Sequence, residues 1–139
     1  VVYMESLECP FNTTDKIIEK FKDIPIKLVD FHAEATGEKR ALGFYLDGKI
    51  SAFFGTHTHV PTADESILPN GTGYITDVGM TGAINSVLGI TPESAIKKMK
   101  GKLPVKFEFS KDIQKMDTVL FNIDESSGKT VDIERMTFI

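Results

Sequence analysis

Two short apolar segments, each followed at once by histidine-bearing sequence, most constrain how this chain can fold. Residues 26–31 (IKLVDF) precede His32, and residues 50–54 (ISAFF) precede the sequence GTHTH at 55–59. His57 lies 25 residues after His32, which is about the length that a strand, a crossover helix and the next parallel strand require. Because parallel strands end at the same edge of a sheet, we expect these histidines to emerge together.

The histidines themselves favour a metal site. His32, His57 and His59 are all the histidines of the sequence, and side chains two apart in an extended segment point to the same side. A lone histidine is usually structural, but three at the ends of predicted parallel strands favour metal ligation. Imidazole suits zinc, iron, manganese, nickel or cobalt, so the residues alone leave the metal open.

Four carboxylates lie near the histidines in the sequence and are candidates for oxygen ligands. A hydrolytic site with two metals about 3.5–4 Å apart also needs such ligands, preferably a bridging carboxylate. Each candidate also has a structural reading, as a helix N-terminal charge, a solvated side chain or a turn cap. The candidates are Asp30, Glu34, Asp64 and Asp77.

Apolar periodicity organises the rest of the chain into one α/β unit. We expect a helix capped by Thr13 or Thr14, a helix over 34–46, and a helix that begins at 91–93 with a buried stripe of Ala95, Ile96, Met99 and Leu103. Strands are expected at 1–7, 26–31, 50–54, 74–76, 105–109, 119–123 and 131–133, with a loop over 77–82. The predicted fold is α/β, with a parallel βαβ core and an antiparallel C-terminal portion.

Composition narrows the partners and the compartment. The chain has 139 residues and a net charge of −4, which argues against binding nucleic acid through bulk charge. Lysines cluster at the end of the third predicted helix, where a solvated face or an RNA or phosphate patch is expected: Lys97, Lys98, Lys100 and Lys102. A single cysteine, Cys9, and the lack of a long apolar segment favour a cytoplasmic protein with no membrane partner.

Three longer sequences carry a resemblance to a known family. Residues 30–36 (DFHAEAT), 55–60 (GTHTHV) and 75–82 (ITDVGMTG) resemble the C-terminal half of the YmdB-like metallophosphoesterases, a branch of the calcineurin-like superfamily. The resemblance implies a sandwich fold and a phosphodiesterase that acts on cyclic nucleotides or related phosphoesters. It also implies two divalent metal ions per complete site (Fe, Mn, Zn or similar), with His32 and His57 on one metal and His59 on the other.

The resemblance further implies that residues 1–139 form the C-terminal half of a single metallophosphoesterase domain. Members of that family carry an aspartate, a bridging glutamate, asparagines and a catalytic histidine in a first half that this sequence lacks. The catalytic residues are therefore expected outside this chain, and the missing half becomes a partner. We expect the isolated chain to bind metal weakly and to hydrolyse little or nothing.

Two other functions stay open at this point. The chain could be a non-catalytic regulatory or RNA-binding module that uses the lysine-rich helix, with structural histidines. It could also be an amidohydrolase with an H-x-H metal site, although the sequence at 77–82 disfavours this. Besides a small phosphoester or cyclic nucleotide, RNA and a second copy of the chain remain candidate partners.

Overall fold

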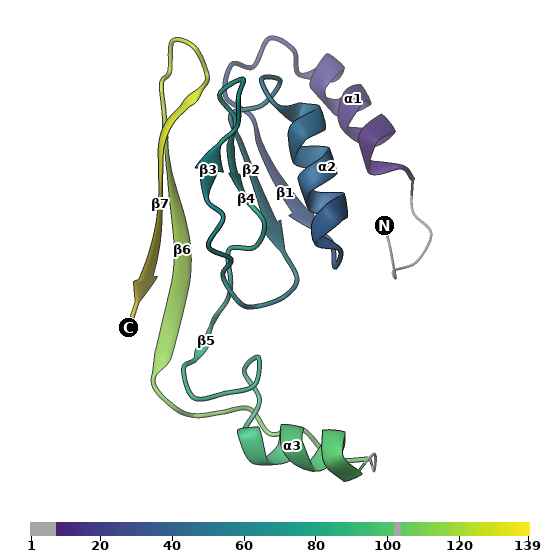
Figure 1. The fold of residues 1–139 in the computed structure, drawn as a ribbon, viewed down its shortest axis with the longest axis vertical. Coiled ribbons are helices and arrows are strands. Elements are labelled where there is room, and N and C mark those ends of the chain that lie inside the picture. Colours follow the sequence, from purple (N-terminus) through teal and green to yellow (C-terminus); the bar gives the residue numbers. More distant parts are fainter. Residues whose placement is uncertain (1–7, 102–103) are drawn as a thin grey trace.

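The computed structural model describes residues 8–101 and 104–139, and its strands form two sheets (Figure 1). The first sheet has the order β1 (Leu28–His32), β2 (Ala52–Thr56), β4 (Gly73–Ile75) and β3 (Ser66–Ile67). The second has the order β5 (Thr81–Ala83), β6 (Gln114–Ile123) and β7 (Thr130–Phe138). β2 pairs in parallel with β1 and β4, and every other pairing is antiparallel. The predicted α/β fold, with a parallel core and an antiparallel C-terminal portion, is confirmed.

The crossover between β1 and β2 positions the two histidine segments. Helix α2 (Thr36–Leu46) connects the strands, and Gly48 follows it with φ +81°, a left-handed conformation that glycine adopts without strain. His32 at the end of β1 pairs in register with Thr56 at the end of β2. The carboxyl ends of both strands therefore lie at the same edge of the sheet, as the spacing predicts.

The first sheet has a helical layer on one face and the second sheet on the other (Figure 1). Helix α1 (Pro10–Lys20) lies beside α2 on the helical side. Between the sheets, the rings of Phe54 and Phe121 lie 6.4 Å apart, and Thr130 Oγ1 donates to the carbonyl of Ser51 at 2.7 Å. The buried core cluster comprises Leu42, Leu46, Ile50, Phe53, Leu68 and Tyr74.

Helix α1 begins earlier than the sequence predicts. Its first residue is Pro10, and the preceding Cys9 makes no side-chain cap. Proline suits the first helical position because its missing N–H would lack an intrahelical partner there. Thr13 and Thr14 therefore lie inside the helix, and Thr14 Oγ1 donates to the carbonyl of Pro10 at 2.8 Å. The expected threonine cap is wrong.

Several elements after β2 also depart from the expectations. Helix α3 (Pro92–Gly101) forms and buries Ala95, but Ile96 and Met99 are exposed, so the predicted buried stripe is wrong. Residues 105–109 form no strand, and only an isolated bridge joins Phe109 to Ile90. Strand β5 occupies part of the predicted loop at 77–82, and β3 has no counterpart among the predicted strands.

The predicted strand at 1–7 and the residues Lys102 and Leu103 lie outside the described residues. Within the described part of the chain, no helix is long and apolar enough to cross a membrane.

Candidate metal centre

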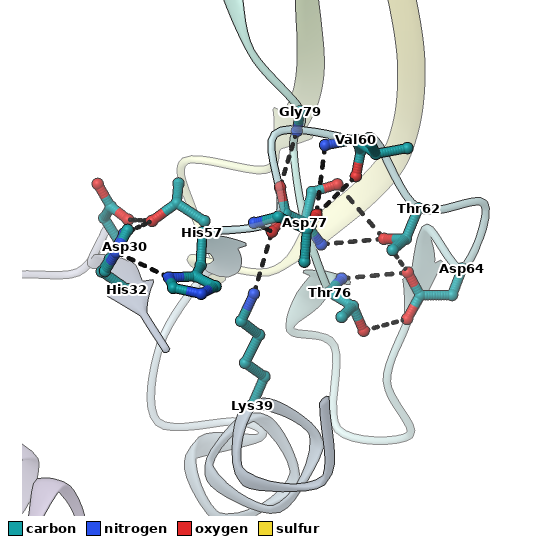
Figure 2. Close-up of polar contacts among 12 residues, drawn as sticks. Asp30, His32, Lys39, His57, Val60, Thr62, Asp64, Thr76, Asp77 and Gly79 are labelled. Atoms are coloured by element: carbon teal, nitrogen blue, oxygen red, sulfur yellow. Dashed lines mark hydrogen bonds and ion pairs between the residues drawn. The ribbon is translucent and has the colours of Figure 1, made fainter. Parts of the chain in front are cut away.

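The ends of β1 and β2 bring two of the three histidines into contact. His32 is the last residue of β1, and His57 follows β2 directly. Nε2 of His32 and Nδ1 of His57 lie 3.2 Å apart, with ring centroids 5.0 Å apart and an angle of 70° between the rings. The two imidazoles thus face each other across the strand ends (Figure 2).

The other ring nitrogen of His32 is held by a short chain of hydrogen bonds. The hydroxyl of Thr56 donates to Asp30 Oδ1 at 3.3 Å. The Oγ1 atom of Thr56 also lies 3.0 Å from Nδ1 of His32. Because that hydroxyl donates its proton to the carboxylate, its oxygen accepts one from Nδ1 of His32. This arrangement leaves Nε2 of His32 as the ring nitrogen with the free lone pair. Asp30, a candidate ligand in the sequence, thus orients His32 through Thr56.

His59 does not join the contact between His32 and His57, but it lines the same pocket. The pocket has a volume of about 580 Å³, and its wall includes all three histidines. They are the only ionisable side chains among the described residues that line it. Within the described ranges, no group of three or more histidine, cysteine, aspartate or glutamate side chains is arranged to hold a metal ion. The chain thus presents imidazoles to a shared space without completing a ligand set.

The loop that carries His57 and His59 has an unusual backbone. His57 has φ 135° and His59 has φ 64°, values that favour glycine. Each such conformation at a residue with a side chain costs about 1–3 kcal/mol, and conformations of this kind cluster at functional sites. Surrounding contacts must therefore hold the loop in place.

Asp77, which follows β4, supplies those contacts. Its Oδ2 accepts from the backbone amide of Thr58 at 2.9 Å, between the two loop histidines, and its Oδ1 accepts from the amide of Gly79 at 3.0 Å. Burial alone raises the pKa of Asp77, but these amides and the ammonium group of Lys39 outweigh it and lower the pKa. Asp77 is therefore a buried carboxylate that positions the histidine loop (Figure 2).

Lys39 of α2 forms a buried ion pair with Asp77. Its Nζ lies 3.1 Å from Asp77 Oδ2, and both side chains are fully buried. Gly55 makes room for the pair, since a Cβ there would lie 1.9 Å from the carbonyl oxygen of Thr76 and 2.8 Å from Cδ of Lys39. The glycine of the sequence GTHTH is required by this close approach.

The remaining candidate carboxylates, Asp64 and Glu34, do not line the histidine pocket. Asp64 accepts from Thr62 Oγ1 at 2.7 Å and from Thr76 Oγ1 and N. Burial raises its pKa, whereas these hydrogen bonds and the charge of Arg40 lower it, with a net lowering. Asp64 thus fixes the residue before Asp77. Glu34 is exposed in the connection between β1 and α2.

Sequence reasoning missed Lys39, Thr56 and Thr58. Thr56 and Thr58 act through contacts with residues far away in the chain, which local pattern does not reveal. Lys39 carried a usable signal, because it precedes Leu42 and Leu46 by three and seven residues and so lies on the buried stripe of α2. A lysine in such a stripe predicts a buried partner of opposite charge.

The donor set fits a divalent transition metal. Two nitrogens that each lie about 2.0–2.1 Å from one zinc ion at a tetrahedral angle are about 3.3–3.4 Å apart. Nε2 of His32 and Nδ1 of His57 are separated by 3.2 Å. These two residues could therefore share one metal, and His59 on the same pocket wall is available to a second.

Comparisons with known proteins place the chain in a family. A model for YmdB-like proteins matches residues 1–136. The chain is 49% identical over 135 residues to the 2′,3′-cyclic-nucleotide 2′-phosphodiesterase of Bacillus subtilis (strain 168), covering 96% of this chain and 51% of that protein. The chain spans about half the length of the curated relatives it matches.

Two solved structures share its fold. A hypothetical protein from Thermus thermophilus superposes with a TM-score of 0.91 at 39% identity, covering 99% of this chain and 53% of that one. A novel phosphatase from Mycoplasma pneumoniae superposes with a TM-score of 0.87 at 41% identity, covering 93% of this chain and 46% of that one. The chain belongs to the family of YmdB-like proteins.

Proposed function

We propose that this chain supplies the histidine ligands of a metal-dependent phosphodiesterase that hydrolyses cyclic nucleotides or related phosphoesters. The contact between His32 and His57 carries the proposal, because it sets two imidazole nitrogens 3.2 Å apart at the carboxyl ends of parallel strands. The similarity to a 2′,3′-cyclic-nucleotide 2′-phosphodiesterase supports the reaction class.

The residues of this chain bind and orient. His32 and His57 would hold one divalent ion and His59 a second, while Asp30 and Thr56 fix the ring of His32. Such ions stabilise the charge of a phosphoryl group and acidify bound water. The pocket wall contributes no lysine or arginine from the described residues, so the proposed metals provide its positive charge.

The other half of the complete protein is proposed to supply the remaining ligands and the catalytic acid. Relatives are about twice as long as this chain, and no complete ligand group exists within the described residues. The 139 residues alone should therefore bind metal weakly and turn over little.

The test compares this chain with the full-length protein that contains it, each in manganese, for hydrolysis of bis(p-nitrophenyl) phosphate and 2′,3′-cyclic AMP. We expect activity only in the full-length protein and its loss on His57→Ala. Hydrolysis that survives both His57→Ala and His59→Ala would contradict the proposal.

An RNA-binding module is the second candidate, because Lys97, Lys98 and Lys100 are exposed on α3. This helix lies away from both sheets (Figure 1). RNA binding that weakens steeply with salt and is lost when these lysines are neutralised would favour it.

A further inference from the structure

The pocket that the histidines line is also lined by side chains that the proposed chemistry does not use. Leu88 and Phe109 are large apolar residues of this lining, and Ser110 and Gln114 are polar ones. Phe109 is 81% exposed and Leu88 is 48% exposed. Both large apolar side chains therefore face the pocket without contributing much to a core.

The backbone that carries these side chains is firmly held. Val87 and Ile90 exchange two backbone hydrogen bonds of 2.8 and 3.1 Å around a tight turn at Leu88 and Gly89. The amide of Ser110 donates to the carbonyl of Gly89 at 2.9 Å, and an isolated bridge joins Phe109 to Ile90. Phe109 is thus an exposed ring on a fixed support, which binds at a lower entropic cost than a ring on a mobile loop.

The turn places a leucine where a smaller residue is usual. Leu88 has φ 55° and Gly89 has φ 93°, and two-residue turns with two positive φ values prefer asparagine, aspartate or glycine at the first position. A leucine in this strained position holds an apolar side chain at the pocket. The backbone strain and the exposure of Phe109 both point to an apolar ligand group.

The residues that line the pocket suit both ends of a nucleotide. The histidines offer metal ligands for a phosphate, and the aromatic ring of Phe109 lines the same pocket together with Ser110 and Gln114. Aromatic side chains stack on nucleobases, while nearby hydroxyl and amide groups bond to base edges. The volume of about 580 Å³ lies within the range of small-molecule sites.

We propose that Phe109 is a stacking platform for the nucleobase of a cyclic nucleotide whose phosphate lies at His32, His57 and His59. The proposal rests on the proposed function and names its substrate class. Phe109 would then determine specificity, because it favours a cyclic phosphodiester that carries a base over one that does not.

The test uses the full-length protein in manganese with two substrates. 2′,3′-Cyclic AMP carries a base, and glycerol 1,2-cyclic phosphate has the same five-membered phosphodiester ring without one. Phe109→Ala should lower kcat/KM for 2′,3′-cyclic AMP by about 5–150-fold, the loss expected for one stacked base. The same variant should keep kcat/KM for the glycerol substrate within about twofold of the parent value. Phe109→Tyr should restore kcat/KM for 2′,3′-cyclic AMP.

Phe107→Ala is the matched control, because Phe107 is a half-exposed aromatic residue on the same segment and does not line this pocket. Phe107→Ala should leave kcat/KM unchanged for both substrates. If Phe109→Ala lowers kcat/KM equally for both substrates, or for neither of them, Phe109 is not a platform for the base. If it instead changes only the oligomeric state in sedimentation, this apolar lining is a contact between copies of the chain, and the proposal is overturned.

A binding measurement separates this proposal from the proposed function. Adenosine carries the base without phosphate, and saturation-transfer NMR can detect its binding to the full-length protein in EDTA. We expect a signal that Phe109→Ala removes and Phe107→Ala retains. If that pattern appears but neither phosphodiester is hydrolysed, the base site stands and the proposed function falls. An adenosine signal that does not depend on Phe109 would overturn the base site whatever the activity.

Discussion

The buried ion pair beneath the histidine loop gives the sharpest test of how the loop is held. Lys39 and Asp77 lie 3.1 Å apart and both side chains are fully buried, and the Asp77 carboxylate also accepts two backbone amides. Lys39→Met keeps most of the side-chain stem and removes the charge. The carboxylate then remains buried without its counter-charge, which costs about 3–5 kcal/mol of unfolding free energy.

The same substitution should weaken metal binding. Asp77 holds the amide of Thr58 between His57 and His59, so an unbalanced carboxylate shifts or loosens the histidine loop. Loss of a residue that orients ligands typically costs about 10–100-fold in metal affinity. Urea denaturation and manganese titration of the full-length protein measure the two effects.

Lys22→Met is the matched control, because Lys22 pairs with Glu19 at 3.4 Å while both side chains are mostly exposed. Exposed ion pairs contribute about 0–1 kcal/mol to stability. The unfolding free energy and the metal affinity of this variant should therefore stay close to those of the parent. The double variant Lys39→Met with Asp77→Asn removes both charges. Its loss of unfolding free energy should be smaller than the sum of the losses in the two single variants. If Lys39→Met costs less than about 1 kcal/mol and leaves metal affinity unchanged, the pair does not hold the loop.

Three further predictions concern the same edge of the sheet. Gly55→Ala should cost about 3 kcal/mol or more in urea denaturation, because its Cβ would lie 1.9 Å from the backbone oxygen of Thr76; a cost below about 1 kcal/mol would contradict this close approach. His57→Gly and His57→Ala should lose metal equally, but the glycine variant should be more stable by about 1 kcal/mol since φ is 135°; equal stabilities would argue against strain. The lowered pKa of Asp64 stabilises the fold above the unfolded pKa near 4, and this contribution is lost as pH falls through the folded pKa. Acid unfolding of Asp64→Asn should therefore depend less on pH below about 4 than that of the parent, and an unchanged dependence would refute this assignment.

Sequence pattern predicted those parts of the fold that depend on local periodicity. The spacing between His32 and His57 predicted a parallel crossover, and the register of β1 with β2 confirms it. Alternating apolar residues predicted strands at 119–123 and 131–133, which form parts of the longer strands β6 and β7 and pair antiparallel as expected. These elements were predictable because their apolar residues recur at the local spacing of a strand or of a strand–helix–strand unit.

The errors arose where an apolar pattern had no sheet or core to join. Residues 105–109 alternate like a strand, yet only Phe109 forms a bridge. Ile96 and Met99 have helical spacing, yet both remain exposed on α3. Periodicity indicates a face that can be buried, but the described part of the chain offers no surface to cover these residues.

The sequence pointed to the histidines as candidate ligands but did not reveal the residues that hold them in place. The histidine sequence shows the candidate ligands directly, and their structural placement brings His32 and His57 together. Asp30 and Asp77 were expected as candidate ligands, but they orient His32 and the histidine loop through Thr56 and Thr58. Such roles depend on contacts between distant segments, which one sequence does not reveal.

The central claim is that His32 and His57 share a metal ion in the complete protein. The most direct test is the metal content of the full-length protein after manganese loading and desalting, for the parent and for His57→Ala. We expect about two metal ions per protomer in the parent and a clear loss in the variant. Equal metal content in the two proteins would contradict the claim and leave these histidines a structural role.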